Sequence, residues 1–352
     1  MTRPDAGTAI APHLERRRLR YLWAGALIWL AALGLLVALF RFVGETSWPV
    51  ELILYLPRHP WVLPGLLVLP SALRPGRRAL LFPLALGALV WLFPIMGFVP
   101  PRPRSDSAGP AIRVLSYNTT HTRDGVEGLR ELVAQTRADL VLFQWSSHLA
   151  NEALSGPGFE GWVVQRAEQF TVATRFPILL LETGGLASGS GSPCVHTVLD
   201  TPLGRLDVYG IRPLSARFEI GAARGRGIRQ RFSELIWAAH SGRLAESTSF
   251  REAQARSIAE MVAKARHPVL IAGDTNLPQG SLFLRRYFAG FQDAFVASSW
   301  GFGFTHPAKL PWLRLDRVLL GRGLGAKSFD VLPKRESAHR PVVAEVIRSS
   351  SD

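Results

Sequence analysis

The chain of 352 residues is apolar and basic: 47% of its residues are hydrophobic, only 19% are charged, and its formal net charge is +14. Soluble globular proteins carry about 25% charged residues, so part of this chain is expected to leave water. The composition excludes a disordered or collagen-like chain, and the single cysteine, Cys194, excludes an intrachain disulfide and a cysteine-based zinc site. At about 150 residues per domain, the length allows two units.

The positive charge is concentrated toward the N-terminus. Residues 1–104 hold 12 arginines, no lysine and four acidic residues, whereas residues 105–352 hold 29 basic and 23 acidic residues. The later part is close to balanced, so charge alone gives little support to a nucleic-acid-binding surface.

Three apolar stretches predict an integral membrane protein, with a basic cytoplasmic N-terminus over residues 1–20 and a membrane region over residues 21–99. The first stretch contains twenty uncharged residues in a row, enough to cross a hydrocarbon core of about 30 Å as a helix. Its length argues against a cleaved signal peptide. The second stretch is the weakest, because prolines, Arg58 and His59 interrupt it. The spans are expected at residues 21–43, 50–73 and 79–99.

Arginines beside these spans predict the orientation, because cytoplasmic loops carry an excess of Lys and Arg. The third span then leaves the membrane on the opposite side, so everything from about Ser105 onward is expected to be extracytoplasmic, after a proline-rich linker over residues 100–110. Arg102 and Arg104 count against this orientation. The arginines assigned to the cytoplasm are Arg16, Arg17, Arg18, Arg20, Arg74, Arg77 and Arg78.

Beyond the linker, the hydrophobic pattern predicts a single layered α/β domain over residues 111–348. Thr122-Arg123-Asp124-Gly125 provides N-cap chemistry before the first helix. A stretch rich in Arg and Gly, 215–250, is expected to be an excursion from the layers. In chain order, the expected elements are a strand at 112–116, a helix at 125–136, strands at 139–144, 170–173 and 206–211, a helix at 251–265, and strands at 268–272, 313–320 and 342–347.

Polar residues stand at the ends of several of these strands. Asn118 follows the first strand, and Asp274 and Asn276 follow the strand at 268–272. Asp316 interrupts the next strand, and His339 precedes the last one. Taken singly, each has a structural explanation, such as a turn for the asparagines or a surface ion pair for Asp316. Functional groups gather where strands end in loops, and the order and spacing of the whole set favour a functional site.

This set resembles the endonuclease/exonuclease/phosphatase superfamily, which includes DNase I, apurinic endonucleases, sphingomyelinases and inositol-phosphate phosphatases. The resemblance covers residues 112–347 and implies an α/β fold, a two-layered β-sandwich flanked by helices in the order α/β/β/α. Membrane spans before such a domain resemble the membrane-anchored branch of the superfamily. The matching segments are RVLSYN (113–118), ADLVLFQW (138–145), FTVATRFPI (170–178), REAQARSIAEMV (251–262), VLIAGDTN (269–276), LRLDRVLL (313–320) and SAHRPVVAEV (337–346).

The resemblance implies metal-assisted cleavage of a phosphate ester, in which Mg²⁺ or Mn²⁺ neutralises the phosphate and stabilises the leaving oxygen. Asn118 matches an amide near the metal. Asp274 matches the carboxylate that orients or activates the attacking water, and it would also contact the metal. Asn276 matches a hydrogen-bond donor to the phosphate. His339 matches the histidine that donates a proton or hydrogen bond to the phosphate, and Asp316 matches the carboxylate paired with it.

Three positions depart from the family pattern. In the family, the third matching strand position reads Gln-Glu, and this glutamate is the main metal ligand. This chain has Trp145 in place of the glutamate, and tryptophan cannot bind a hard cation. The family's Ser-Asp-His has Ala338 in the middle. A histidine on a central strand is replaced by Arg212, which can bind phosphate bidentately but is no proton donor at neutral pH. Losing two charged ligands costs about 4 kcal/mol, roughly a thousandfold in metal affinity.

Other polar residues offer replacements for the lost ligands, although no motif supports them. Glu336 lies two residues before Ala338, and His121 closely follows Asn118. Three more acids lie in segments that could approach the site: Asp124, Glu152 and Glu168.

Two functions fit these observations. The first is a membrane-anchored phosphohydrolase that acts on a lipid-linked or envelope phosphate ester, with the lipid bilayer as its partner. The alternative is a catalytically inactive pseudoenzyme that binds a phosphorylated ligand at the membrane surface, with Trp145 filling the metal site and no metal required. The retained Asp–His and Asp–Asn pairs favour the enzyme. A run of arginines could also bind nucleic acid or anionic lipid headgroups. Its members are Arg217, Arg224, Arg226, Arg229 and Arg231.

Overall fold

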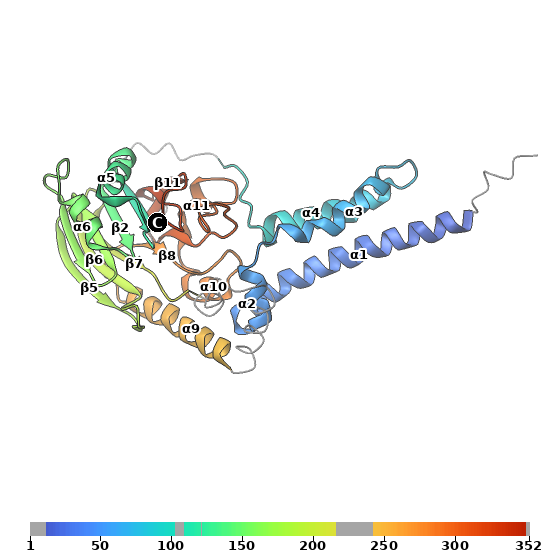
Figure 1. The fold of residues 1–352 in the computed structure, drawn as a ribbon, viewed down its shortest axis with the longest axis horizontal. Helices are drawn as coiled ribbons and strands as arrows, with labels where there is room; N and C mark the ends of the chain where they lie inside the picture. Colours follow the sequence, from blue (N-terminus) through green and yellow to red (C-terminus); the bar gives the residue numbers. More distant parts are fainter. Residues whose placement is uncertain (1–11, 103–108, 121, 216–241, 350–352) are drawn as a thin grey trace, which may run out of the picture.

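The computed structural model describes residues 12–102, 109–120, 122–215 and 242–349. A group of helices projects from one side of an α/β domain (Figure 1). Three sequence-based predictions lie outside the described residues: the basic run between Arg217 and Arg231, His121 as a ligand, and part of the proline-rich linker.

The projecting helices are the predicted membrane region. By length and composition, two segments suffice to cross a membrane, one within α1 (Pro12–Phe42) and one at Arg78–Ile95. The predicted second span is instead a bent pair, because α2 (Trp48–Tyr55) and the segment His59–Ala72 meet at 93°. Prolines in and just after the break remove backbone donors and disfavour a continuous helix. The remaining elements are η1 (Gly44–Thr46), η2 (His59–Val62), α3 (Leu63–Ala72), η3 (Arg78–Leu80), α4 (Leu81–Val90) and η4 (Trp91–Ile95).

The two arginine-rich segments lie together, at the end of the membrane region that points away from the α/β domain. Figure 1 shows α1 running from the domain to this far end, where the turn between α3 and α4 also lies. Arg77 in that turn pairs with Glu15 of α1, with 2.9 Å between nitrogen and oxygen. The arginines that the charge pattern places on one side of the membrane are therefore at the same end of the structure.

Two six-stranded sheets face each other in the α/β domain, in the orders β11-β12-β1-β2-β4-β3 and β5-β6-β7-β8-β10-β9. Buried apolar residues of both sheets, such as Leu142 and Leu270, form the core between them. The strands are β1 (Ala111–Asn118), β2 (Leu140–Gln144), β3 (Val163–Ala167), β4 (Phe170–Thr174), β5 (Ile178–Gly184), β6 (Cys194–Thr201), β7 (Gly204–Ile211), β8 (Val269–Asp274), β9 (Gln292–Asp293), β10 (Asp316–Leu320), β11 (Leu324–Val331) and β12 (Val342–Arg348).

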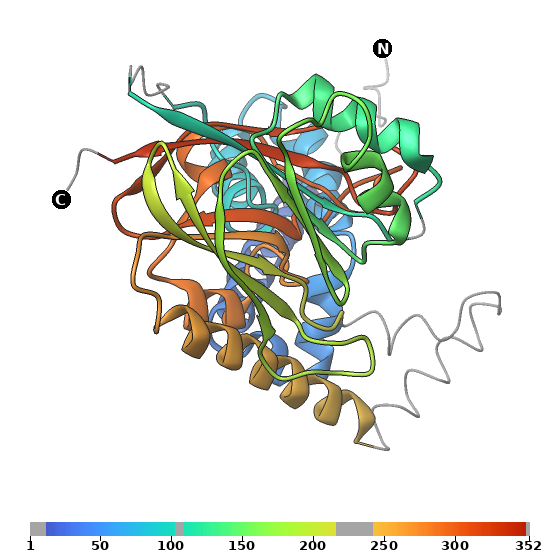
Figure 2. The same cartoon turned by 90° about the vertical axis from the view of Figure 1, so that its left-hand side faces the viewer.

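Helices cover the outer faces of the sandwich. α5 (Gly125–Thr136) and α6 (His148–Leu154) pack on the first sheet through residues such as Leu129 and Phe143. α9 (Arg243–Val262) and α10 (Leu282–Phe288) pack on the second sheet. Figure 2 shows α5 and α6 on one side of the strands and α9 on the other. Short α11 (Ala294–Ser298) lies between β9 and β10 in the chain. This α/β/β/α order confirms the predicted fold class.

The strand register brings the polar strand ends to one edge. β1 runs parallel to β2, with Asn118 opposite Gln144. β10 runs antiparallel to β8, and its first residue, Asp316, lies opposite Asp274. Asn118, Asp274 and Asp316 therefore meet at the same edge, although they come from different parts of the chain.

Two local predictions were wrong. Asp124 precedes α5, but its side chain does not cap the helix. Its carboxylate instead accepts hydrogen bonds from the hydroxyls of Tyr117 (2.9 Å) and Thr122 (2.8 Å). The helix predicted at 251–265 begins earlier, at Arg243, and ends at Val262, while most of the predicted excursion over 215–250 lies outside the described residues.

The membrane region is packed against the α/β domain through buried polar contacts. Glu51 of α2 forms an ion pair with Arg251 of α9, and both side chains are buried. Thr248 Oγ1 donates to the same carboxylate at 2.7 Å. Burial lowers the pKa of Arg251 to about 10, against the opposing charge of Glu45. The two parts therefore form one packed unit.

Arg251→Met is expected to lower the free energy of unfolding by about 3–5 kcal/mol, because it leaves the Glu51 carboxylate buried without its partner. The double variant Glu51→Leu/Arg251→Met should recover most of this loss, since neither charge remains. Unfolding of the full chain in detergent micelles measures both, with Arg256→Met, an exposed arginine of the same helix, as control. A double variant as unstable as the single one would contradict the ion-pair explanation.

Candidate active site

Three buried side chains converge at the polar edge of the sandwich. Asp274 ends β8, Asp316 begins β10, and His339 lies in the loop before β12. One ligand atom from each lies within 4.8 Å of the other two. The fold therefore brings together the three residues that the sequence predicts to be catalytic, and their roles stay predictions.

His339 lies between the two carboxylates. Its Nδ1 is 2.9 Å from Asp316 Oδ2, and its Nε2 is 3.7 Å from Asp274 Oδ2. When Asp316 is ionised, its carboxylate only accepts hydrogen bonds, so Nδ1–H of His339 is the donor in this contact. Burial raises the pKa of Asp316; the pairing with His339 opposes this rise, and the charge of Asp274 adds to it.

Two asparagines orient Asp274. Asn118 Nδ2 donates to Asp274 Oδ2 at 2.8 Å, and its Oδ1 accepts from the backbone N–H of Thr120 at 3.0 Å. The backbone N–H of Asn276 donates to Asp274 Oδ1 at 2.9 Å, while its side chain donates to the carbonyl of Pro213 at 2.8 Å. Asn118 is predicted to lie near a metal, and its amide N–H groups point to Asp274. Asn276 is predicted to bind phosphate, and one N–H of its amide holds a neighbouring loop.

The loop that follows Asp274 is held by side chains of the membrane region. Asn276 has a φ of +49°, in the left-handed region that is unfavourable for residues other than glycine. Tyr55 donates a hydrogen bond to the carbonyl of this same residue, so it supports the turn whose N–H orients Asp274. The contacts are Tyr55 Oη to Asn276 O (2.6 Å), Arg58 Nη2 to Gln279 O (2.9 Å) and Leu282 N to Glu45 Oε2 (2.8 Å).

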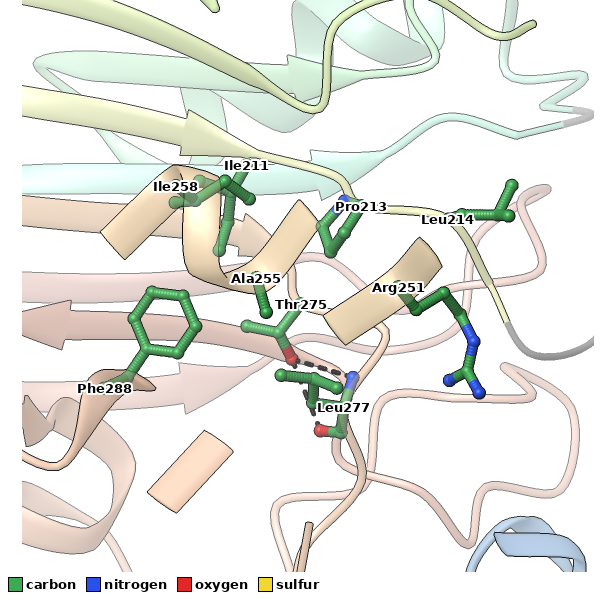
Figure 3. Close-up of a pocket in the computed structure, with 9 residues that line it drawn as sticks. All are labelled: Ile211, Pro213, Leu214, Arg251, Ala255, Ile258, Thr275, Leu277 and Phe288. Atoms are coloured by element: carbon green, nitrogen blue, oxygen red, sulfur yellow. Dashed lines mark hydrogen bonds between the residues drawn. The ribbon is translucent and has the colours of Figure 1, made fainter. Parts of the chain in front are cut away.

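Behind this loop, the packing against α9 leaves almost no space. Figure 3 shows Thr275 and Leu277 of the loop beside Ala255 and Arg251 of the helix. The cavity there is about 10 Å³, roughly the space of one water molecule. Thr275 Oγ1 also accepts from the N–H of Leu277 at 3.3 Å. Among the described residues, this cavity is therefore too small to hold a substrate.

His306 is a site residue that the sequence analysis missed. Its buried ring lies 4.4 Å, centroid to centroid, from the ring of His339. The adjacent Thr305 Oγ1 accepts from the backbone N–H of Asp316 at 3.2 Å, so this loop also fixes the start of β10. His306 lies in a loop at no characteristic spacing from another ligand, and nothing in the sequence distinguishes it.

The two departures at Trp145 and Arg212 are in direct contact. The guanidinium carbon of Arg212 lies 4.2 Å from the centroid of a Trp145 ring, and its Nη1 donates to Gln169 Oε1 at 2.6 Å. Trp145 has a φ of +52° and is 37% exposed. Burial lowers the pKa of Arg212, while the charge of Asp274 opposes this effect. The charge of Arg212 therefore interacts with that of the predicted catalytic carboxylate.

Asp274, Asp316 and His339 could hold a metal ion, since carboxylate and imidazole are ligands of divalent cations. Within the described residues, no proposed replacement ligand joins this group. Glu336 and Glu152 are exposed. Asp124 is bound to Tyr117, and Glu168 accepts hydrogen bonds from Ser192 and Thr183.

Solved structures share the fold. Humanized TDP2 of D. rerio is 15% identical with a TM-score of 0.50, over 67% of this chain and 99% of that one. The mannosyl-6-phosphatase of Bacteroides thetaiotaomicron is 12% identical with a TM-score of 0.46, over 67% and 99%. Beta toxin from Staphylococcus aureus is 15% identical with a TM-score of 0.46, over 68% and 100%. At these identities, the likeness concerns the fold alone.

No curated protein matches the chain. The sequence model of the Endonuclease/Exonuclease/phosphatase family, in contrast, matches residues 114–352, which is more than half of the chain and includes every site residue described above. The chain belongs to the Endonuclease/Exonuclease/phosphatase family.

Proposed function

We propose that the protein is a membrane-anchored phosphoric ester hydrolase that acts on a lipid-linked or envelope phosphate ester. The observation that carries this proposal is the contact between the membrane region and the catalytic loop. Tyr55 and Arg58 belong to the segment between the two apolar helices, and both donate hydrogen bonds to carbonyls of the loop after Asp274. A site held in this way stands at the membrane face, where a phosphate ester anchored in lipid would be presented.

In the proposed reaction, the residues of the site divide the proton transfers. The carboxylate of Asp274, oriented by Asn118, positions and activates the attacking water. Asp316 holds the ring of His339 through Nδ1, so that Nε2 faces the reacting phosphate and supplies a proton or hydrogen bond as the ester bond breaks. Arg212 binds the phosphate charge. Asn276 uses one N–H of its amide on Pro213, and the second N–H is the proposed donor to the phosphate.

Members of the family generally depend on a divalent metal, and the carboxylates of Asp274 and Asp316 would hold it here, which leaves His339 free for the proton transfer. We propose Mg²⁺ or Mn²⁺, because oxygen-rich sites suit these hard cations. Such an ion, when bound, neutralises charge on the phosphate and on the leaving oxygen.

The proposed location is a cell membrane, with the α/β domain outside the cytoplasm. It rests on the arginines at the far end of the membrane region, where Arg77 pairs with Glu15 of α1. An excess of arginine is typical of the cytoplasmic side, which supports a domain on the opposite side.

A second candidate function is a pseudoenzyme that binds a phosphorylated ligand without cleaving it. The specific observation in its favour is Trp145, which stands where the resemblance implies the main metal-binding glutamate. The two functions share phosphate binding and differ in turnover, so assays of hydrolysis separate them.

Asp274→Asn is expected to lower the turnover of a phosphate ester at least about 100-fold, because it removes the base that activates water. Phosphate released by the full chain in micelles measures this, with Asp330→Asn, an exposed acid on β11, as control. Chelation should also lower turnover, and Mg²⁺ or Mn²⁺ should restore it. A wild-type protein that binds phosphate esters but hydrolyses none would support the pseudoenzyme.

Asp316→Asn is expected to lower kcat by about 100-fold or more, because His339 loses the carboxylate that orients it. An ordinary aspartate has a pKa of about 4. The pKa of Asp316 is raised, so on acidification its carboxylate takes up a proton at a higher pH than an ordinary aspartate does. The wild-type pH profile should therefore fall on its acid side above this value, and the fall due to this group should be absent in the variant. An identical acid limb in both proteins would contradict the role of Asp316.

Tyr55→Phe is expected to destabilise the full chain by about 1–3 kcal/mol, because the buried carbonyl of Asn276 loses its donor. It should also lower kcat more than it changes KM, since Asp274 loses orientation rather than contact with substrate. Tyr21→Phe, at an exposed tyrosine of α1, is the matched control. A variant with lower stability but unchanged kcat would show that the membrane region does not position the site.

A further inference from the structure

The guanidinium of Arg212 is a cation with unused donors. A guanidinium carries five N–H groups, and Arg212 uses only one of them in a hydrogen bond to a described residue, the bond to Gln169. Its Nε is buried without a hydrogen-bond partner. It forms no ion pair with any acid in the described ranges. The charge of Asp274 therefore compensates the burial of this cation only without direct contact, and no carboxylate among the described residues satisfies its remaining donors.

Trp145 provides the surface on which this cation rests. The ring lies under the guanidinium at 4.2 Å, within the range of a cation–π contact. The backbone of Trp145 has a φ of +52°, which is rare for a large side chain and is retained where the surroundings demand it. Gln169 holds the guanidinium from the side. The plane of Arg212 is therefore fixed before any ligand arrives.

The two substitutions change the charge of the site in the same direction. Trp145 stands where the resemblance implies a metal-binding glutamate, and Arg212 stands where it implies a histidine. One change removes a negative charge that would attract an ion, and the other adds a permanent positive charge beside Asp274. Part of the positive charge that a metal ion would bring to the phosphate is thus built into this chain.

We propose that Arg212, stacked on Trp145, is a phosphate-binding site that does not require a divalent cation. Arginine matches two phosphate oxygens with a pair of parallel N–H donors, and the free Nη donors of Arg212 allow this geometry. The inference deepens the proposed function, because it concerns how the same site recognises a phosphate ester. An ion held by Asp274 and Asp316 would then serve turnover and not the binding of phosphate.

The test measures the binding of inorganic phosphate to the full chain in micelles. Calorimetry reports the affinity, once in the presence of EDTA and once in the presence of Mg²⁺. Phosphate should bind in EDTA with nearly the affinity seen in Mg²⁺. Arg212→Gln should weaken this binding at least about 30-fold, by loss of two charge-assisted hydrogen bonds. Arg212→Lys should recover only part of it, because lysine cannot bind bidentately. Trp145→Ala should weaken it by a smaller factor, and Arg205→Gln, an exposed arginine of β7, should leave it unchanged.

A second measurement follows the metal instead of the phosphate. Trp145→Glu should increase the binding of Mn²⁺, detected by electron paramagnetic resonance of the free ion, because it returns the carboxylate that the resemblance implies. Phosphate binding that appears only with Mg²⁺ or Mn²⁺, or that is unchanged in Arg212→Gln, would overturn the proposal. Binding in EDTA without hydrolysis of any ester would support this site and count against the proposed hydrolase, so the two failures are distinguishable.

Discussion

Two carboxylates face each other in the interior of this domain, because the antiparallel register of β8 and β10 sets Asp274 opposite Asp316. Two such charges at low dielectric ionise together only when donors and cations compensate them. His339 donates to Asp316 from one side, and Asn118 donates to Asp274 from the other. The positive charge of Arg212 also acts on Asp274. The other polar residues of this edge are arranged around the burial of these two acids.

The membrane region takes part in the same arrangement. Buried charges in such a region are costly and mark functional contacts. Arg58 donates to the carbonyls of Leu54, Ile95 and Gln279, so one residue joins two segments of the predicted membrane region to the loop after Asp274. Arg58 and the prolines make the second apolar stretch a poor membrane span. Their place in the chain is explained by the packing of this stretch against the α/β domain. The bend between α2 and the following segment lets Tyr55 reach Asn276.

The sequence allowed the fold class to be predicted because the strands of the core, such as β2 and β8, are apolar throughout and end in polar residues. β3 was not predicted, since its side chains are half-buried or exposed and give no continuous apolar run. The convergence of Asp274, Asp316 and His339 could be predicted from their positions at strand ends. The contacts of Tyr55 and His306 could not, because each joins segments far apart in the chain through side chains with no motif.

The central claim is that this is a hydrolase whose site works at the membrane face. Its most direct test is to place the full chain in lipid vesicles that contain a phosphate monoester lipid or a phosphate diester lipid, and to measure the release of the cleaved product. The account predicts cleavage of at least one lipid ester, at a higher rate than a water-soluble ester of the same class. A folded protein that cleaves neither lipid ester, or that cleaves only soluble esters, would contradict it.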